Sequence, residues 1–141
     1  MDITQFELEL LKLKPDNDDF AYVVDQLVEL VPIELRESLI SSIFKFFESH
    51  PLEECGMPGP LIHLIEDYYP KYKDILLTSL QKVPNSSSIL MVNRILNSTL
   101  SEEERGEYIA SLEAITNNEK VNQQLQDEAS SYLNFQSEKN S

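Results

Sequence analysis

The chain has 141 residues, with 25 acidic against 11 basic side chains and a formal net charge of −14. This length suits one domain, and 41% hydrophobic with 26% charged residues is a globular composition, which excludes general disorder. The basic residues are scattered and form no stripe, which argues against nucleic-acid binding, whereas the acidic excess favours basic partners.

The N-terminal segment lacks the features of a secretory signal, and no run approaches the ~18 apolar residues of a membrane span. We therefore expect a cytoplasmic protein with no membrane partner. The single cysteine, Cys55, excludes an internal disulfide and suits a reducing compartment.

Apolar residues at three- and four-residue steps predict successive amphipathic helices. Residues 3–13 mix strand-like and helical spacing, and we favour a helix because a lone strand would leave its backbone groups unpaired. Further helices are predicted over residues 18–31 and 33–49, and the glycines and prolines of residues 56–60 predict a loop. Pro60 then begins a short helix that ends before Pro70, and another helix follows over residues 71–83.

Three more helices are predicted in the second half of the chain. Asn85 or Ser86 caps a segment whose apolar residues cover so much of the circumference that it should be the most buried helix. The sequence from Ser101 to Glu104 predicts a capping box at the start of the next helix, and residues 121–133 mark the last one. We therefore predict an all-α fold. Residues 1–135 form a single domain of paired antiparallel helices in an irregular repeat-like stack, and residues 136–141 form a disordered tail.

Potential metal ligands or catalytic residues gather near the Gly-Pro loop: His50, Cys55, His63 and Asp67. Their spacing lacks the paired Cys-x-x-Cys or His-x-x-x-His pattern of structural zinc sites. In a nucleophilic triad, Glu53 and Glu54 beside Cys55 would raise the pKa of its thiol rather than lower it. We interpret these residues as capping or packing groups, and we expect no catalytic residue, metal or cofactor.

Carboxylates and aromatic residues flank the same loop: Glu53, Glu54, Glu66, Asp67, Tyr68 and Tyr69. Charge combined with aromatic side chains beside an irregular loop is typical of a binding surface, so we predict that these six residues bind a partner. The alternative is a solvated surface for the carboxylates and helix packing for the tyrosines. Arg94 lies on an apolar helix, and we interpret it as pairing with a carboxylate inside the fold.

Breakers and apolar residues alternate through the middle of the chain, in Gly56-Met57-Pro58-Gly59-Pro60-Leu61-Ile62-His63-Leu64-Ile65-Glu66 and Asn93-Arg94-Ile95-Leu96-Asn97, with Tyr72 and Pro84 between them. This pattern resembles the small helical immunity proteins of bacterial polymorphic or contact-dependent toxin systems, over roughly residues 50–134. The resemblance implies an acidic cytoplasmic inhibitor that binds a cognate toxin domain, often a nuclease, and masks its active site or a nearby surface. The alternative is a helical adaptor that holds a peptide in a groove. The oligomeric state stays open.

Overall fold

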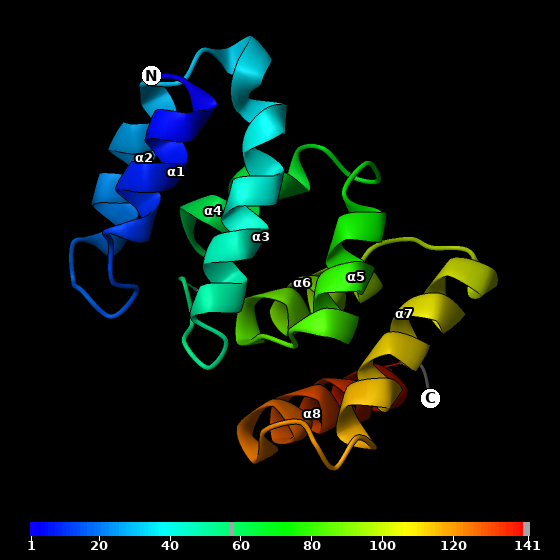
Figure 1. Ribbon diagram of the computed structural model, residues 1–141. Helices are drawn as coiled ribbons and strands as arrows, with labels where there is room; N and C mark the ends of the chain where they lie inside the picture. The colour runs from blue at the N-terminus through cyan, green and yellow to red at the C-terminus, as the bar shows by residue number, and fades with distance from the viewer. Residues whose placement is uncertain (57, 140–141) are drawn as a thin grey trace.

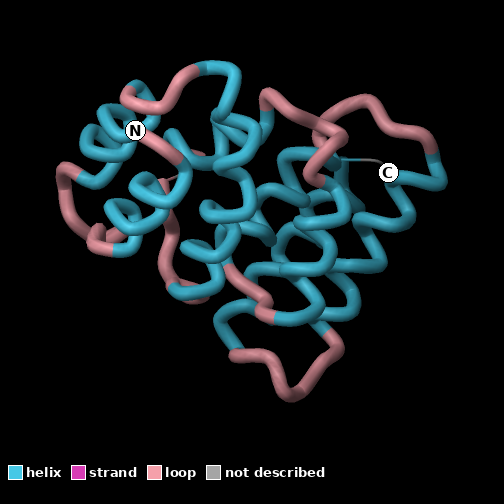
Figure 2. The backbone as a smooth tube through the Cα atoms, turned by 45° about the horizontal axis from the view of Figure 1, so that its top comes forward, coloured by secondary structure: helices cyan, strands magenta, loops and turns pink. Residues whose placement is uncertain are grey.

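The computed structural model describes residues 1–56 and 58–139. These residues form eight α-helices and one 3₁₀ helix, with no strand among them, as Figure 2 shows. The elements are α1 (Ile3–Leu11), α2 (Phe20–Glu29), η1 (Ile33–Leu39), α3 (Ile40–Ser49), α4 (Gly59–Glu66), α5 (Lys73–Lys82), α6 (Ser86–Leu96), α7 (Glu102–Thr116) and α8 (Gln123–Lys139). The all-α prediction is confirmed. Helices α1 and α2 lie at one end, α7 and α8 at the other, and α3 to α6 between them (Figure 1).

The opening segment is a helix, as predicted, because its first turn is capped from both directions. The backbone N–H of Gln5 donates to Asp2 Oδ1 at 2.8 Å, and the backbone N–H of Asp2 donates to Gln5 Oε1 at 3.2 Å. Helix α1 buries Phe6 and Leu10. The N-terminal ammonium of Met1 donates to the carbonyl of Leu30 at 2.8 Å, which ties the start of α1 to the end of α2.

Residues 33–49 form two elements, so the prediction of one continuous helix is wrong. The first seven residues are the 3₁₀ helix η1, whose Ile33 and Leu35 are exposed, and burial begins only at Leu39. Arg36 Nε donates to the carbonyl of Val31 at 3.0 Å, which holds η1 against the end of the preceding turn. Apolar spacing of three and four residues is compatible with either helix type, so the pattern alone did not separate them.

Helix α6 is the centre of the fold, as its apolar pattern predicted. Nine of its eleven residues are buried, and it contacts α3, α5, α7 and α8. Asn85 caps it, because the backbone N–H of Ser88 donates to Asn85 Oδ1 at 2.8 Å. The same Asn85 side chain donates through Nδ2 to Ser79 Oγ at 3.1 Å, which joins the cap of α6 to α5.

Only half of the predicted capping box at the start of α7 forms. The backbone N–H of Glu104 donates to Ser101 Oγ at 3.1 Å, as expected for an N-cap serine. The Glu104 carboxylate does not return to the Ser101 backbone, and instead it accepts a hydrogen bond from the hydroxyl of Tyr69 at 3.0 Å. A tertiary partner has therefore replaced the local one.

The prediction of a disordered tail from residue 136 is wrong for residues 136–139, which belong to α8. Gln136 is 1% exposed, and its Nε2 donates to Asn93 Oδ1 at 2.8 Å and to Asn97 Oδ1 at 2.9 Å. Its Oε1 accepts from Arg105 at 2.9 Å, so one glutamine joins α8 to both α6 and α7. This anchor is polar, so the pattern of apolar residues does not reveal it. Residues 140–141 lie outside the described residues.

Candidate functional site

The six residues predicted to bind a partner flank α4 and enter different contacts. Glu53 and Glu54 precede its N-terminal end, whereas Glu66 is its last residue and Asp67 follows directly.

The N-terminal group faces the loop before α4 and helix α8. Glu53 Oε1 lies 3.1 Å from His50 Nδ1. Glu54 is exposed and close enough to α8 to act on Tyr132. Burial, and then the charges of Glu128 and Glu54, raise the pKa of the Tyr132 hydroxyl. Glu54 therefore borders the surface of α8.

Glu66 is held by an ion pair inside the fold. Arg94 Nε lies 2.6 Å from Glu66 Oε2, and the Arg94 terminal nitrogen donates to Oε1 at 3.0 Å, so the pair is bidentate. The Glu66 hydrogen bond raises the pKa of Arg94, and His63 Nδ1 lies 3.4 Å from the same carboxylate. The predicted internal partner of Arg94 is confirmed, and it is a residue that the sequence had suggested for binding.

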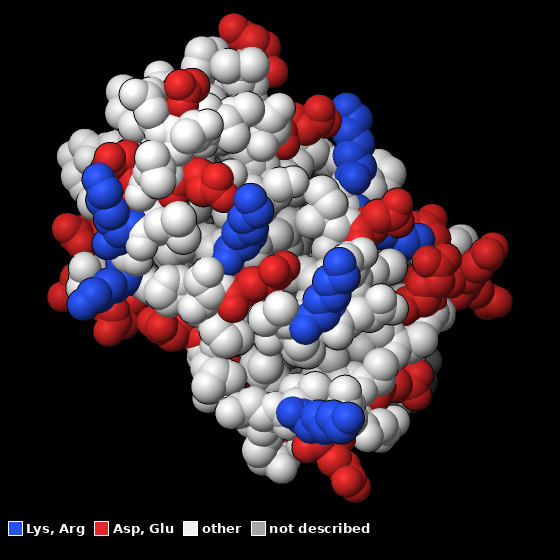
Figure 3. Space-filling view, in the orientation of Figure 1, with Lys and Arg blue, Asp and Glu red and all other residues white. Residues whose placement is uncertain are grey.

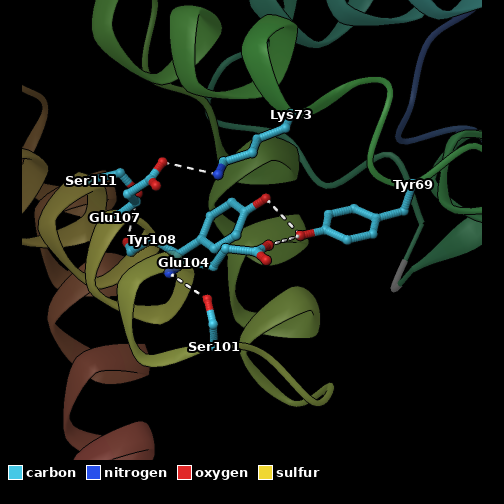
Figure 4. A network of polar contacts seen from close by, with 7 residues as sticks. All are labelled: Tyr69, Lys73, Ser101, Glu104, Glu107, Tyr108 and Ser111. Atoms are coloured by element: carbon cyan, nitrogen blue, oxygen red, sulfur yellow. Dashed lines mark hydrogen bonds and ion pairs between the residues drawn. The ribbon is translucent and has the colours of Figure 1, made fainter.

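Tyr69 also belongs to an internal network, which Figure 4 shows. Its hydroxyl donates to Glu104 Oε2 at 3.0 Å and lies 3.2 Å from the hydroxyl of Tyr108 on α7. Lys73 Nζ lies 2.9 Å from Glu107 Oε2 and 5.5 Å from the centroid of the Tyr108 ring. Burial is the main cause that raises the pKa of both tyrosines. This network attaches the start of α5 to α7, and no sequence signal linked residues so far apart.

Three of the predicted residues, Glu66, Asp67 and Tyr68, line an open groove of about 640 Å³ between α4 and the α2–η1 segment, which we call the α2–α4 groove. Its lining residues are Asp25, Val28, Ile33, Arg36, Gly59, Pro60, His63, Leu64, Glu66, Asp67 and Tyr68. The α4 wall begins at Gly59, whose φ of +77° is a conformation that favours glycine. The opposite wall was not predictable from the sequence, because Asp25 and Ile33 line the groove only through the packing of α2 on α4.

The α2–α4 groove combines free carboxylates with exposed apolar surface. Asp25 and Asp67 are exposed, and neither forms an ion pair within the described part of the chain. Ile33 is 72% exposed at the groove, and Tyr22, one helical turn before Asp25, is 66% exposed. Arg36 is the only basic side chain among the lining residues, apart from His63. An acidic groove with apolar side chains at its edge suits a basic protein surface.

The wider surface is acidic too, with its cations dispersed. Figure 3 shows most lysine and arginine side chains apart from one another, except at the left edge of the view, with carboxylates beside most of them and gathered over the start of α7. Exposed ion pairs occupy several lysines of the chain: Lys12–Glu9, Lys45–Glu7 and Lys71–Glu37. The visible face therefore carries no basic patch of the kind that binds a phosphate backbone.

The structure does not bring His50, Cys55, His63 and Asp67 together. The two histidines pair with Glu53 and Glu66, and Cys55 is fully buried. Burial, with a smaller contribution from the charge of Glu53, raises the pKa of the Cys55 thiol to about 11. The thiol is therefore protonated at neutral pH. Across residues 1–56 and 58–139, no group of three or more His, Cys, Asp or Glu residues is arranged to hold a metal ion.

Within the same described ranges, no helix combines the length and the apolar character needed to cross a bilayer.

Comparison with known proteins finds no matching family model, no matching curated protein and no matching solved structure. The resemblance to immunity proteins therefore depends on the sequence pattern alone, and it stays a prediction.

Proposed function

We propose that this protein is a non-catalytic inhibitor of the immunity type, which uses the α2–α4 groove to bind a basic surface of a toxin domain. The observation that carries the proposal is the pair of exposed carboxylates, Asp25 and Asp67, on opposite walls of one groove. Carboxylates without an internal cation remain available for lysine or arginine of a partner. Ile33 and Tyr68 supply apolar contact area beside them.

The mechanism is steric and electrostatic masking. Carboxylates take the places that phosphates would occupy in a basic nuclease cleft, and the apolar side chains exclude water around them. Close charge pairs in such interfaces couple by ~1.5–7 kcal/mol, and complementary charge raises association rates to about 10⁸–10⁹ M⁻¹s⁻¹ at low salt. Glu66 acts indirectly, because its pair with Arg94 fixes the end of α4 where Asp67 lies.

The test is an affinity pull-down from the producing strain at low and high salt, with mass-spectrometric identification of the retained proteins. We expect one basic toxin domain whose activity is abolished by the wild-type protein. The variant Asp25→Asn/Asp67→Asn should associate with it at least tenfold more slowly at low salt. The matched control is Glu102→Gln/Glu103→Gln, which removes the same charge at the start of α7 and should have a much smaller effect.

Equal binding by the groove variant and the control would contradict the assignment of the α2–α4 groove. Retention of many weakly bound segments, with no toxin inhibited, would favour the adaptor function instead.

A further inference from the structure

A second groove lies on α5, α7 and the turn before α8, and it shares no lining residue with the α2–α4 groove. One part, of about 360 Å³, runs between α5 and α7, and a second part, of about 400 Å³, continues past the α7–α8 turn. Both parts are lined by the same four residues where they meet: Gln81, Pro84, Asn118 and Val121. We call this continuous feature the α5–α7 groove.

The first part of the α5–α7 groove has a mostly apolar lining with small residues on one wall, and its one acidic lining residue, Glu107, is paired with Lys73. Ala110 and Ala114 lie one turn apart on α7 and are both exposed, opposite Leu77 and Leu80 of α5. Alanine at these positions leaves room between the two helices. The space therefore suits apolar side chains of another chain, which would bury surface that α5 and α7 leave exposed.

The second part carries positive charge that nothing in the described residues neutralises. Lys82, the last residue of α5, and Lys120, in the α7–α8 turn, both line it. Neither forms an ion pair with a described residue; among the other lysines, Lys12, Lys45, Lys71 and Lys73 do, whereas Lys14 and Lys139 do not. Lys82 also offsets the negative end of the α5 dipole. No such role explains Lys120, since it lies outside any helix.

Side chains that can hydrogen-bond to a peptide backbone lie where these two parts meet. The side-chain amide of Gln81 makes no hydrogen bond with another described residue, and it is exposed where the parts meet. Asn118 Oδ1 accepts a hydrogen bond from the backbone N–H of Lys120 at 3.0 Å. The side-chain NH₂ group of Asn118 is not used in this bond and can donate to a bound segment. An extended segment therefore finds an apolar wall, amide groups and two cations in succession along one groove.

We propose that the α5–α7 groove binds a short peptide segment of a partner protein, with apolar side chains against Ala110 and Ala114 and an acidic residue between Lys82 and Lys120. The charge of the bound segment is opposite to that of the partner at the α2–α4 groove. The proposal rests on the lysines and the alanine wall, and it does not depend on the proposed function.

The test is a titration of the ¹⁵N-labelled full chain, followed by two-dimensional NMR, with three matched peptide sets. Each set holds peptides of about six residues, which span roughly 20 Å when extended. They combine leucine and valine with glutamate in the first set, glutamine in the second and lysine in the third. We expect the glutamate set to bind best and to shift the amide signals of Val83, Asn118 and Val121, which belong to the groove or adjoin it.

Two variants test the charge and the shape separately. Lys82→Gln/Lys120→Gln should weaken binding of the glutamate set roughly fivefold, as expected for two exposed charge pairs. Ala114→Gln fills the groove from an exposed helical position and should abolish binding without unfolding the protein. The control Lys12→Gln/Lys14→Gln removes the same charge beyond α1 and should bind as the wild type does.

The proposal is overturned if the glutamine or lysine set binds as tightly as the glutamate set, or if the shifted signals lie outside this groove. It is also overturned if no set binds, or if Ala114→Gln leaves binding unchanged. A fatty-acid anion such as dodecanoate, titrated in the same way, supplies a further refutation if it binds while every peptide set fails.

Discussion

Breaking the Glu66–Arg94 ion pair should destabilise the protein by about 2 kcal/mol, far more than breaking an ordinary surface pair. The pair is bidentate, at 2.6 and 3.0 Å, and the two side chains are 25% and 35% exposed. Hydrogen bonds to charged groups contribute about 1.5–3 kcal/mol each when buried, whereas exposed pairs contribute roughly 0–1 kcal/mol. Partial exposure places this pair between those limits.

The assay is a double-mutant cycle with Glu66→Gln, Arg94→Met and the combined variant, with the free energy of unfolding measured in urea by circular dichroism. The coupling energy should be about 1–2 kcal/mol. For a chain of this size, a loss of about 2 kcal/mol corresponds to a fall in Tm of roughly 6–8 °C. The matched control is Glu37→Gln, which breaks the Lys71 pair, whose side chains are 46% and 71% exposed. That change should cost less than about 0.5 kcal/mol.

A coupling energy below about 0.5 kcal/mol, or equal losses in the cycle and the control, would refute the argument that geometry and partial burial make this pair stronger. Such a result would also mean that the Glu66 carboxylate is available to a partner. If the coupling energy is large and the Glu66→Gln protein binds the partner as the wild type does, Glu66 has a structural role and no role in recognition.

Four further predictions concern stability and the burial of Cys55. Gln136→Ala should cost about 2–4 kcal/mol in urea unfolding, because it leaves Asn93 and Arg105 without their partner; a loss below about 0.5 kcal/mol would mean that the end of α8 is not anchored there. Cys55 should react with a thiol reagent only as urea unfolds the protein, and fast reaction of the folded protein at neutral pH would contradict its burial. Because the folded pKa of Cys55 is raised from 9.0 to about 11, the unfolded chain loses its proton first as pH rises. Stability should therefore fall by up to about 2–3 kcal/mol between these pH values, a component that Cys55→Ala removes. Ser101→Ala should cost about 1 kcal/mol as a lost N-cap, read from the same urea transitions, and no loss would show that solvent replaces the cap.

The helices were predictable because their signals are local. Apolar spacing, the prolines and the caps at Asp2, Asn85 and Ser101 act over a few residues, so they can be read along the chain. The same locality explains the two errors in the elements. Apolar spacing of three and four residues fits both an α-helix and a 3₁₀ helix, so it could not predict η1. A polar anchor such as Gln136 leaves no trace in a pattern of apolar residues.

The candidate site depended on contacts between residues far apart in the sequence. Glu66 meets Arg94 from 28 residues away, and Tyr69 meets Glu104 from 35 residues away, so two residues that resembled binding groups became internal partners. Asp25 and Asp67 line one groove only because α2 packs on α4.

The sequence by itself determined the helical class, the acidic charge and the central place of α6, because these follow from composition and short-range periodicity. Tertiary structure alone decided which carboxylates are paired and which face a groove. Pairing and exposure depend on the distances between helices, and these are set by the packing of side chains from the whole core.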